Sequence, residues 1–170
     1  KVCQRIALEY QLNAETVAAV VAALSPNNKW ERNLKDAENV VAAFMLGSVD
    51  DAMNVKVCTY RKNLAKAVDI LNATHCDHES ILKGPKVIEF YHSILGSQDD
   101  VCIDGHAYSV WFGERLTMKE VPNIGKKLRQ TIKQDYLTAT DFINQNSDEY
   151  FMPCQVQAIT WVAHKRLHNV

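Results

Sequence analysis

The chain has 170 residues, of which 47% are hydrophobic and 23% are charged, and its formal net charge is −1. This length suffices for one domain with a buried core over residues 1–170, and no apolar run approaches the roughly 20 residues that span a bilayer. The near-neutral charge excludes a general attraction to nucleic acid, so a DNA partner requires basic residues gathered on one face.

The first half of the chain predicts two long helices. Residues 16–24 are apolar throughout and rich in alanine, which predicts a buried helix that Ser25 and Pro26 end. Over residues 30–46 the apolar side chains recur every three or four positions, which predicts an amphipathic helix with Gly47 as its stop.

The same periodicity predicts helices over most of the remaining chain. A helix over residues 57–71 leaves basic side chains on a separate face, and shorter patterns follow at residues 78–82, 85–95, 105–112, 124–142 and 155–167. The β-branched run at residues 101–103 is too short to carry a sheet. We therefore expect an all-α fold of roughly eight helices, with Trp30, Trp111 and Trp161 in its core.

The five cysteines argue against a disulfide framework, because their number is odd and their spacing wide and irregular. His75, Cys76 and His78 invite a metal interpretation, but no second cluster has suitable ligand spacing, so we expect no metal. A reducing compartment fits this cysteine usage.

The most informative stretch, residues 81–112, contains two turns that each open a helix. In the first turn Gly84 can adopt a positive φ and Pro85 suits the first helical position, which places Lys86 in the first helical turn. Unpaired N–H groups there attract phosphate, and the helix dipole disfavours a protonated amine, as a lysine nucleophile requires. An ordinary surface lysine beside a turn is the alternative interpretation.

The second turn is expected to begin a helix at Gly105, with Asp104 as its cap. A carboxylate at this position can accept hydrogen bonds from free N–H groups of the first turn, and capping alone would explain its presence. His106, in that first turn, can orient a neighbour or bind phosphate, and a structural hydrogen bond is its alternative role.

Together the two turns resemble the signature of the helix-hairpin-helix DNA glycosylase superfamily, especially endonuclease III and its 8-oxoguanine-removing relatives. Residues 82–86, LKGPK, are similar to the family's LPGVGxK hairpin but are two residues shorter, and Asp104 follows Lys86 by eighteen residues, as the family's catalytic aspartate follows its lysine. Residues 103–107, IDGHA, resemble the corresponding turn of adenine glycosylases. The four-cysteine iron–sulfur loop of endonuclease III is absent from the sequence.

The resemblance covers about residues 16–167. Residues 23–28 are similar to the segment whose polar residue fills the gap left by an extruded base, and Asn27 matches that residue. Residues 60–67 resemble the helix that precedes the hairpin, and residues 124–136 and 157–162 resemble the closing helices.

The resemblance implies a two-lobed helical fold with a cleft, and a DNA glycosylase that flips a damaged or modified base, with or without lyase activity at the abasic site. It implies Lys86 and Asp104 as catalytic residues, and we assign DNA contacts to Asn27, Arg61, Lys62, Lys83, Gly84 and His106. No cofactor and no membrane partner are expected. We expect a monomer acting on duplex DNA, in the cytoplasm or associated with the nucleoid.

Two other functions fit the same sequence. One is a non-catalytic DNA-binding or adaptor protein on a glycosylase-like scaffold, and the other is a helical protein–protein interaction module in which Lys86 and Asp104 are turn residues only. A further turn at residues 121–127, VPNIGKK, predicts a helix start or a second phosphate contact. Its Lys126 and Lys127, with Arg129, add to a candidate DNA-facing surface that also contains Arg61, Lys62 and Lys66. Solvated helix faces would explain these basic residues equally well.

Overall fold

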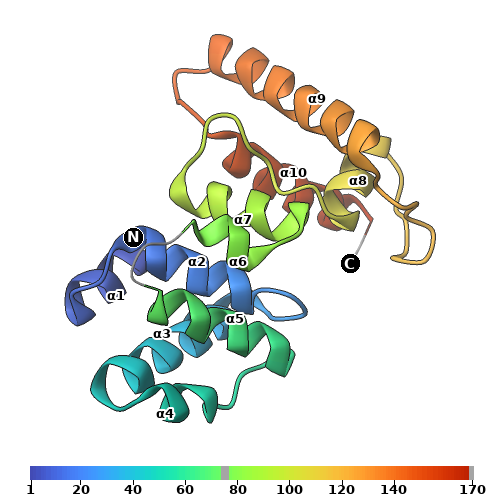
Figure 1. The fold of residues 1–170 in the computed structure, drawn as a ribbon. Coiled ribbons are helices and arrows are strands. Elements are labelled where there is room, and N and C mark those ends of the chain that lie inside the picture. Colours follow the sequence, from blue (N-terminus) through green and yellow to red (C-terminus); the bar gives the residue numbers. More distant parts are fainter. Residues whose placement is uncertain (74–76, 169–170) are drawn as a thin grey trace. The chain divides into compact units, whose positions relative to one another are not determined.

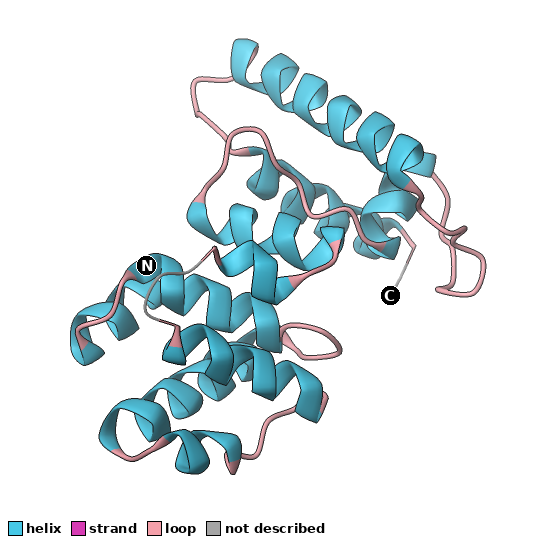
Figure 2. Ribbon diagram, in the orientation of Figure 1, coloured by secondary structure: helices cyan, strands magenta, loops and turns pink. Residues whose placement is uncertain are grey.

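The computed structural model describes residues 1–73 and 77–168. Within these residues the chain forms helices joined by loops and no strand (Figure 2), so the prediction of an all-α fold is confirmed. Figure 1 labels the helices in chain order: α1 (Val2–Tyr10), α2 (Ala14–Leu24), α3 (Trp30–Leu46), α4 (Val49–Met53), α5 (Arg61–Asn72), α6 (His78–Leu82), α7 (Pro85–Leu95), α8 (Gly105–Phe112), α9 (Lys126–Gln145) and α10 (Pro153–Leu167).

The observed helices differ most from the expected ones at α1, α4 and α5, and α2, α9 and α10 differ by two or three residues at one or both ends. Helices α1 and α4 are additional, and the five-residue α4 begins where Ser48 Oγ accepts from the N–H of Asp51 at 3.1 Å. Helix α5 starts at Arg61 and not at residue 57, and in the non-helical segment before it the N–H of Cys58 donates to Asp36 Oδ2 at 2.7 Å.

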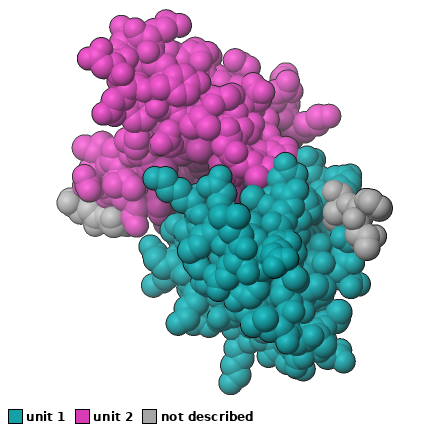
Figure 3. All heavy atoms as spheres, turned by 90° about the vertical axis from the view of Figure 1, so that its left-hand side faces the viewer, with its two compact units in different colours: residues 1–91 teal, residues 92–170 magenta. Residues whose placement is uncertain are grey.

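The chain divides into two compact units, residues 1–91 and residues 92–170 (Figure 3). The division falls within α7, so its first residues belong to the first unit and its last residues to the second. Lys86 consequently belongs to the first unit and Asp104 to the second.

In the first unit α2 lies at the centre and packs against α1, α3, α5 and α6. Residues 17–24 are all buried, as their apolar composition predicts. Beside them, the fully buried Asp36 accepts from Arg32 Nε at 2.6 Å and Asn28 Nδ2 at 3.0 Å, in addition to Cys58 N. These donors compensate a carboxylate that is removed from water.

The second unit is built around residues 101–103, which run through its core without forming a strand. Their carbonyls are bound by side chains: Gln157 Nε2 donates to Cys102 O at 2.7 Å, and Arg129 Nη1 donates to Ile103 O at 2.8 Å. The apolar side chains of this segment pack with α8 and α9, whose buried members are Ala107, Tyr108, Ile132 and Tyr136.

The expectation that all three tryptophans lie in the core is wrong. Trp30 is 49% exposed and Trp161 is 36% exposed. Trp111 is half-buried against the core of the second unit, and its Nε1 donates to Asp135 Oδ2 at 2.7 Å. The apolar pattern placed each tryptophan on an apolar helix face, but the described residues leave Trp30 and Trp161 partly exposed.

Candidate nucleic-acid interface

The turn between α6 and α7 is only two residues long, and both have a positive φ. Lys83 has φ 50° and ψ 140°, and Gly84 has φ 90°. Gly84 is suited to this backbone, whereas a lysine is strained in it. The predicted positive φ of Gly84 is thereby confirmed, and the chain enters α7 without the longer loop of the glycosylase hairpin.

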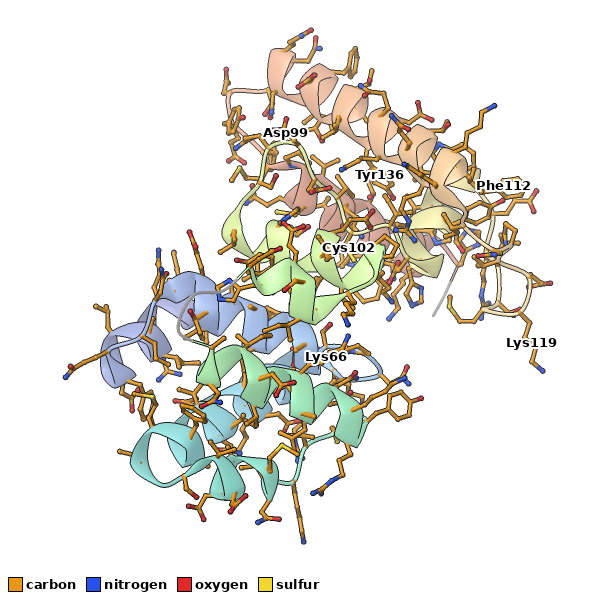
Figure 4. The ribbon with its side chains drawn as sticks, viewed as in Figure 1. Lys66, Asp99, Cys102, Phe112, Lys119 and Tyr136 are labelled. Atoms are coloured by element: carbon orange, nitrogen blue, oxygen red, sulfur yellow. The ribbon has the colours of Figure 1, made fainter. Side chains whose placement is uncertain are left out.

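Three lysines gather beside this turn, and we refer to Lys62, Lys66 and Lys83 as the basic turn. Lys66 Nζ donates to the carbonyl of Leu82, which is the last residue of α6, so α5 is joined to the turn (Figure 4). Burial, together with the positive charges of Lys83 and Lys62, lowers the pKa of the Lys66 amine below its ordinary value. Lys62 and Lys83 are therefore each close enough to Lys66 for their charges to repel its ammonium.

Asn27 lies near the start of α5 in the same unit. It is exposed, has φ 59°, and its Nδ2 donates to Tyr60 Oη at 2.6 Å. Lys62 Nζ stands 5.5 Å from the centroid of the Tyr60 ring, so Tyr60 connects Asn27 with a member of the basic turn. Arg61 is the first residue of α5 and is exposed.

Lys86 is exposed at the second position of α7, as the sequence predicts. Its place in the first helical turn puts it near the positive end of the helix dipole. Its role as a nucleophile stays a prediction.

Asp104 caps α8, as expected. Its Oδ1 accepts from the N–H groups of His106 and Ala107, each at 3.0 Å. Burial raises the pKa of Tyr136 to about 12, and the negative charge of the Asp104 carboxylate acts in the same direction. The carboxylate therefore has a structural role, whatever further role it has.

A loop packs tightly against this second turn. A Cβ atom at Gly105 would stand 2.9 Å from Met118 Sδ and 3.0 Å from its Cε, which is closer than atoms of these types approach without a shift. Only glycine fits here without displacing Met118. In the Asp-Gly pair, Asp104 therefore caps the helix and Gly105 leaves room for the Met118 side chain.

His106 is exposed next to Trp161 of α10. The two ring centroids are 5.5 Å apart, and Lys165 Nζ stands 5.0 Å from the centroid of the Trp161 ring. Contact of His106 with phosphate stays a prediction. Arg129 differs from the surface residue that we expected, because it is half-buried and donates to Ile103 O.

A family model matches residues 1–168 and therefore spans both units. The chain belongs to the DUF7178 family. This family is described as one of unknown function. No curated protein and no solved structure matches the chain.

For this DUF7178 member, the described residues divide the expected site between the two units. Lys86 and most of the assigned DNA contacts belong to residues 1–91, namely Asn27, Arg61, Lys62, Lys83 and Gly84, whereas Asp104 and His106 belong to residues 92–170. The sequence groups Lys66 with Arg61 and Lys62 in the candidate DNA-facing surface, but we assigned it no individual DNA contact. Its spacing of four residues from Lys62 on one helix was the available signal.

The metal interpretation of His75, Cys76 and His78 falls partly outside the described residues, because residues 74–76 are not among them. In the part of the chain that the structure describes, no group of three or more His, Cys, Asp or Glu side chains is arranged to hold a metal ion. His78 instead lies 3.4 Å from Thr16 Oγ1 through Nε2 and 3.1 Å from Tyr91 Oη through Nδ1. Among the same residues, no helix is long and apolar enough to cross a membrane.

Proposed function

We propose that this DUF7178 protein binds duplex DNA through the basic turn and excises a damaged or modified base. The observation that carries the proposal is the gathering of Lys62, Lys66 and Lys83, whose charges act on one another in a chain with a net charge of −1. Lysines held this close repel one another in the free protein. A phosphate backbone would relieve that repulsion and release its own counterions.

The backbone of the turn supports the same function. The first N–H groups of α7 have no acceptor within the helix and point out of its N-terminal end, where the turn lies. The helix dipole adds partial positive charge at this end. Lys83 occupies a strained conformation at this position, and strained backbone is commonly found at functional sites. Phosphate is the ligand that suits both features.

The proposed chemistry rests on the eighteen-residue spacing between Lys86 and Asp104 and on the resemblance to glycosylases. The proposal includes their two-lobed helical fold. The target base leaves the stack because the glycosidic carbon is inaccessible within a duplex, and Asn27 fills the vacated space after releasing Tyr60. Lys86, as a neutral amine, attacks the anomeric carbon and expels the base, and the resulting Schiff base permits β-elimination. Asp104 stabilises the positive charge that develops on the sugar.

Substitution of Lys86 and Asp104 tests the chemistry. Lys86→Gln should abolish borohydride trapping of the protein on abasic DNA, and Asp104→Asn should reduce turnover with less effect on DNA binding. Lys29→Gln is the matched control, since Lys29 is also an exposed lysine of the first unit. Unchanged excision by both variants would refute the assignment of the active site.

The basic turn is tested separately by its contribution to DNA binding. Lys62→Gln combined with Lys83→Gln should weaken binding and lower the slope of log K against log salt by about two, because each phosphate contact contributes about 0.9 to that slope. Lys29→Gln with Lys35→Gln removes the same charge from exposed positions elsewhere in the unit and should retain more of the slope. Equal losses in the two double variants would exclude the basic turn as the contact.

A second function, non-catalytic DNA binding, is favoured by one observation. The carboxylate of Asp104 already accepts two backbone N–H groups as a helix cap, so its presence requires no chemistry. Salt-dependent DNA binding through the basic turn, without excision from any modified duplex and without borohydride trapping, would support this function. Absence of DNA binding at low salt would favour a protein–protein interaction module.

A further inference from the structure

Two histidines lie one helical turn apart at the end of α10. The N–H of His168 donates to the carbonyl of His164 at 3.2 Å, so helical geometry continues through His168. Residues four apart on a helix share a face, and the centroids of the two imidazole rings are only 4.4 Å apart. The pair is thus positioned by the helix itself.

The second observation concerns one ring nitrogen of this pair. His164 Nε2 is buried and has no hydrogen-bond partner among the described residues. A buried polar atom without a partner is uncommon in a folded protein and calls for an explanation, such as an ion that the free protein lacks. An imidazole nitrogen is also among the commonest metal ligands in proteins.

The ring separation matches chelation of one ion. A bond of about 2.0–2.1 Å from nitrogen to metal places the ion roughly 3.2 Å from each ring centroid. Two rings at about 90° around the ion then have centroids roughly 4.5 Å apart, whereas a tetrahedral angle would separate them by roughly 5.2 Å. The observed 4.4 Å places the two rings close enough for one ion to be bound by both imidazoles.

We infer that His164 and His168 form a two-imidazole site for a divalent transition metal ion that imidazole ligands suit, such as Ni²⁺ or Cu²⁺. Carbonyl groups at the end of α10 favour a cation there. The positive charges of Lys165 and Arg166, in the same last turn, repel a dication. The Lys165 ammonium lies over the face of the Trp161 ring, which partly offsets its charge. No third protein ligand is grouped with the pair among the described residues. The site is independent of the proposed DNA chemistry.

Calorimetric titration of the full chain with Ni²⁺ tests the site. The unaltered protein should bind one ion per chain, His164→Gln and His168→Gln should each weaken binding at least tenfold, and the double variant should show no binding at this site. Glutamine is a good helix former, and circular dichroism would establish that α10 is retained. Binding should also weaken steeply on acidification, because both imidazoles must be deprotonated to bind.

His106→Gln is the matched control, because His106 is an exposed histidine that contacts α10 at Trp161. It should bind Ni²⁺ within twofold of the unaltered protein. Electron paramagnetic resonance of the Cu²⁺ complex should show two equatorial imidazole nitrogens. Full affinity in the double variant, an equal loss in His106→Gln, a thiolate charge-transfer band, or fewer than two nitrogens would each overturn the inference.

Discussion

Replacing Asp104 by alanine or asparagine separates its role as a helix cap from its role as a charge. Alanine removes both N–H···O bonds at 3.0 Å that hold the first turn of α8. Loss of such a cap costs about 0.5–2 kcal/mol, and two bonds to one half-buried carboxylate oxygen place this site in the upper half of that range. Asparagine retains an acceptor oxygen at the same position and should cost only a few tenths of a kcal/mol.

Urea denaturation followed by circular dichroism measures both variants. Asp104→Ala should lower the free energy of unfolding by about 1–2 kcal/mol without changing the slope against urea. Asp77→Ala is a matched cap control, since Asp77 accepts one N–H at 3.2 Å at the start of the five-residue α6, and it should cost less. An Asn variant as unstable as the Ala variant, or an Ala variant within about 0.3 kcal/mol of the unaltered protein, would refute the capping argument.

Three further outcomes are expected. Asp36→Ala leaves the N–H of Cys58 and the amide of Asn28 without their acceptor, so urea denaturation should show a loss of about 3 kcal/mol. The pKa of Tyr136 is raised to about 12, so its contribution to stability is complete below about pH 10. That contribution should fall by about 2–3 kcal/mol as pH rises to 12, and Tyr136→Phe should lack this fall. Removing Lys62 and Lys83 should raise the pKa of Lys66, measured by NMR titration; an unchanged pKa would contradict their proximity.

The regular parts of the fold follow from local sequence. The three- and four-residue spacing of apolar residues predicted the extent of α3, and Gly47 predicted its end. The Asp-Gly pair predicted the start of α8. Helix α4 was missed although the equally short α6 was predicted, and its start depends on the Ser48 cap.

The remaining differences depend on contacts between distant residues. The expected helix does not extend to the residues before Arg61, where the N–H of Cys58 instead binds Asp36 of another helix. Periodicity identifies an apolar face but not how completely another element covers it, which is why Trp161 was expected in the core. Lys66 likewise belongs to the basic turn only because α5 packs beside the end of α6, where its amine donates to Leu82 O. The pair His164 and His168 was visible in the spacing of the sequence and was overlooked.

At Lys83 the backbone conformation favours glycine, whereas the positive charge of the basic turn requires lysine. Its φ of 50° and ψ of 140° suit glycine, and holding another residue there costs about 1–3 kcal/mol. Lys83→Gly would release this strain and remove a positive charge in the same step. Selection of variants for thermal stability alone would therefore be expected to recover glycine at this position and to remove one member of the basic turn. A stabilised form of the protein is thus the wrong one in which to test the proposed DNA binding.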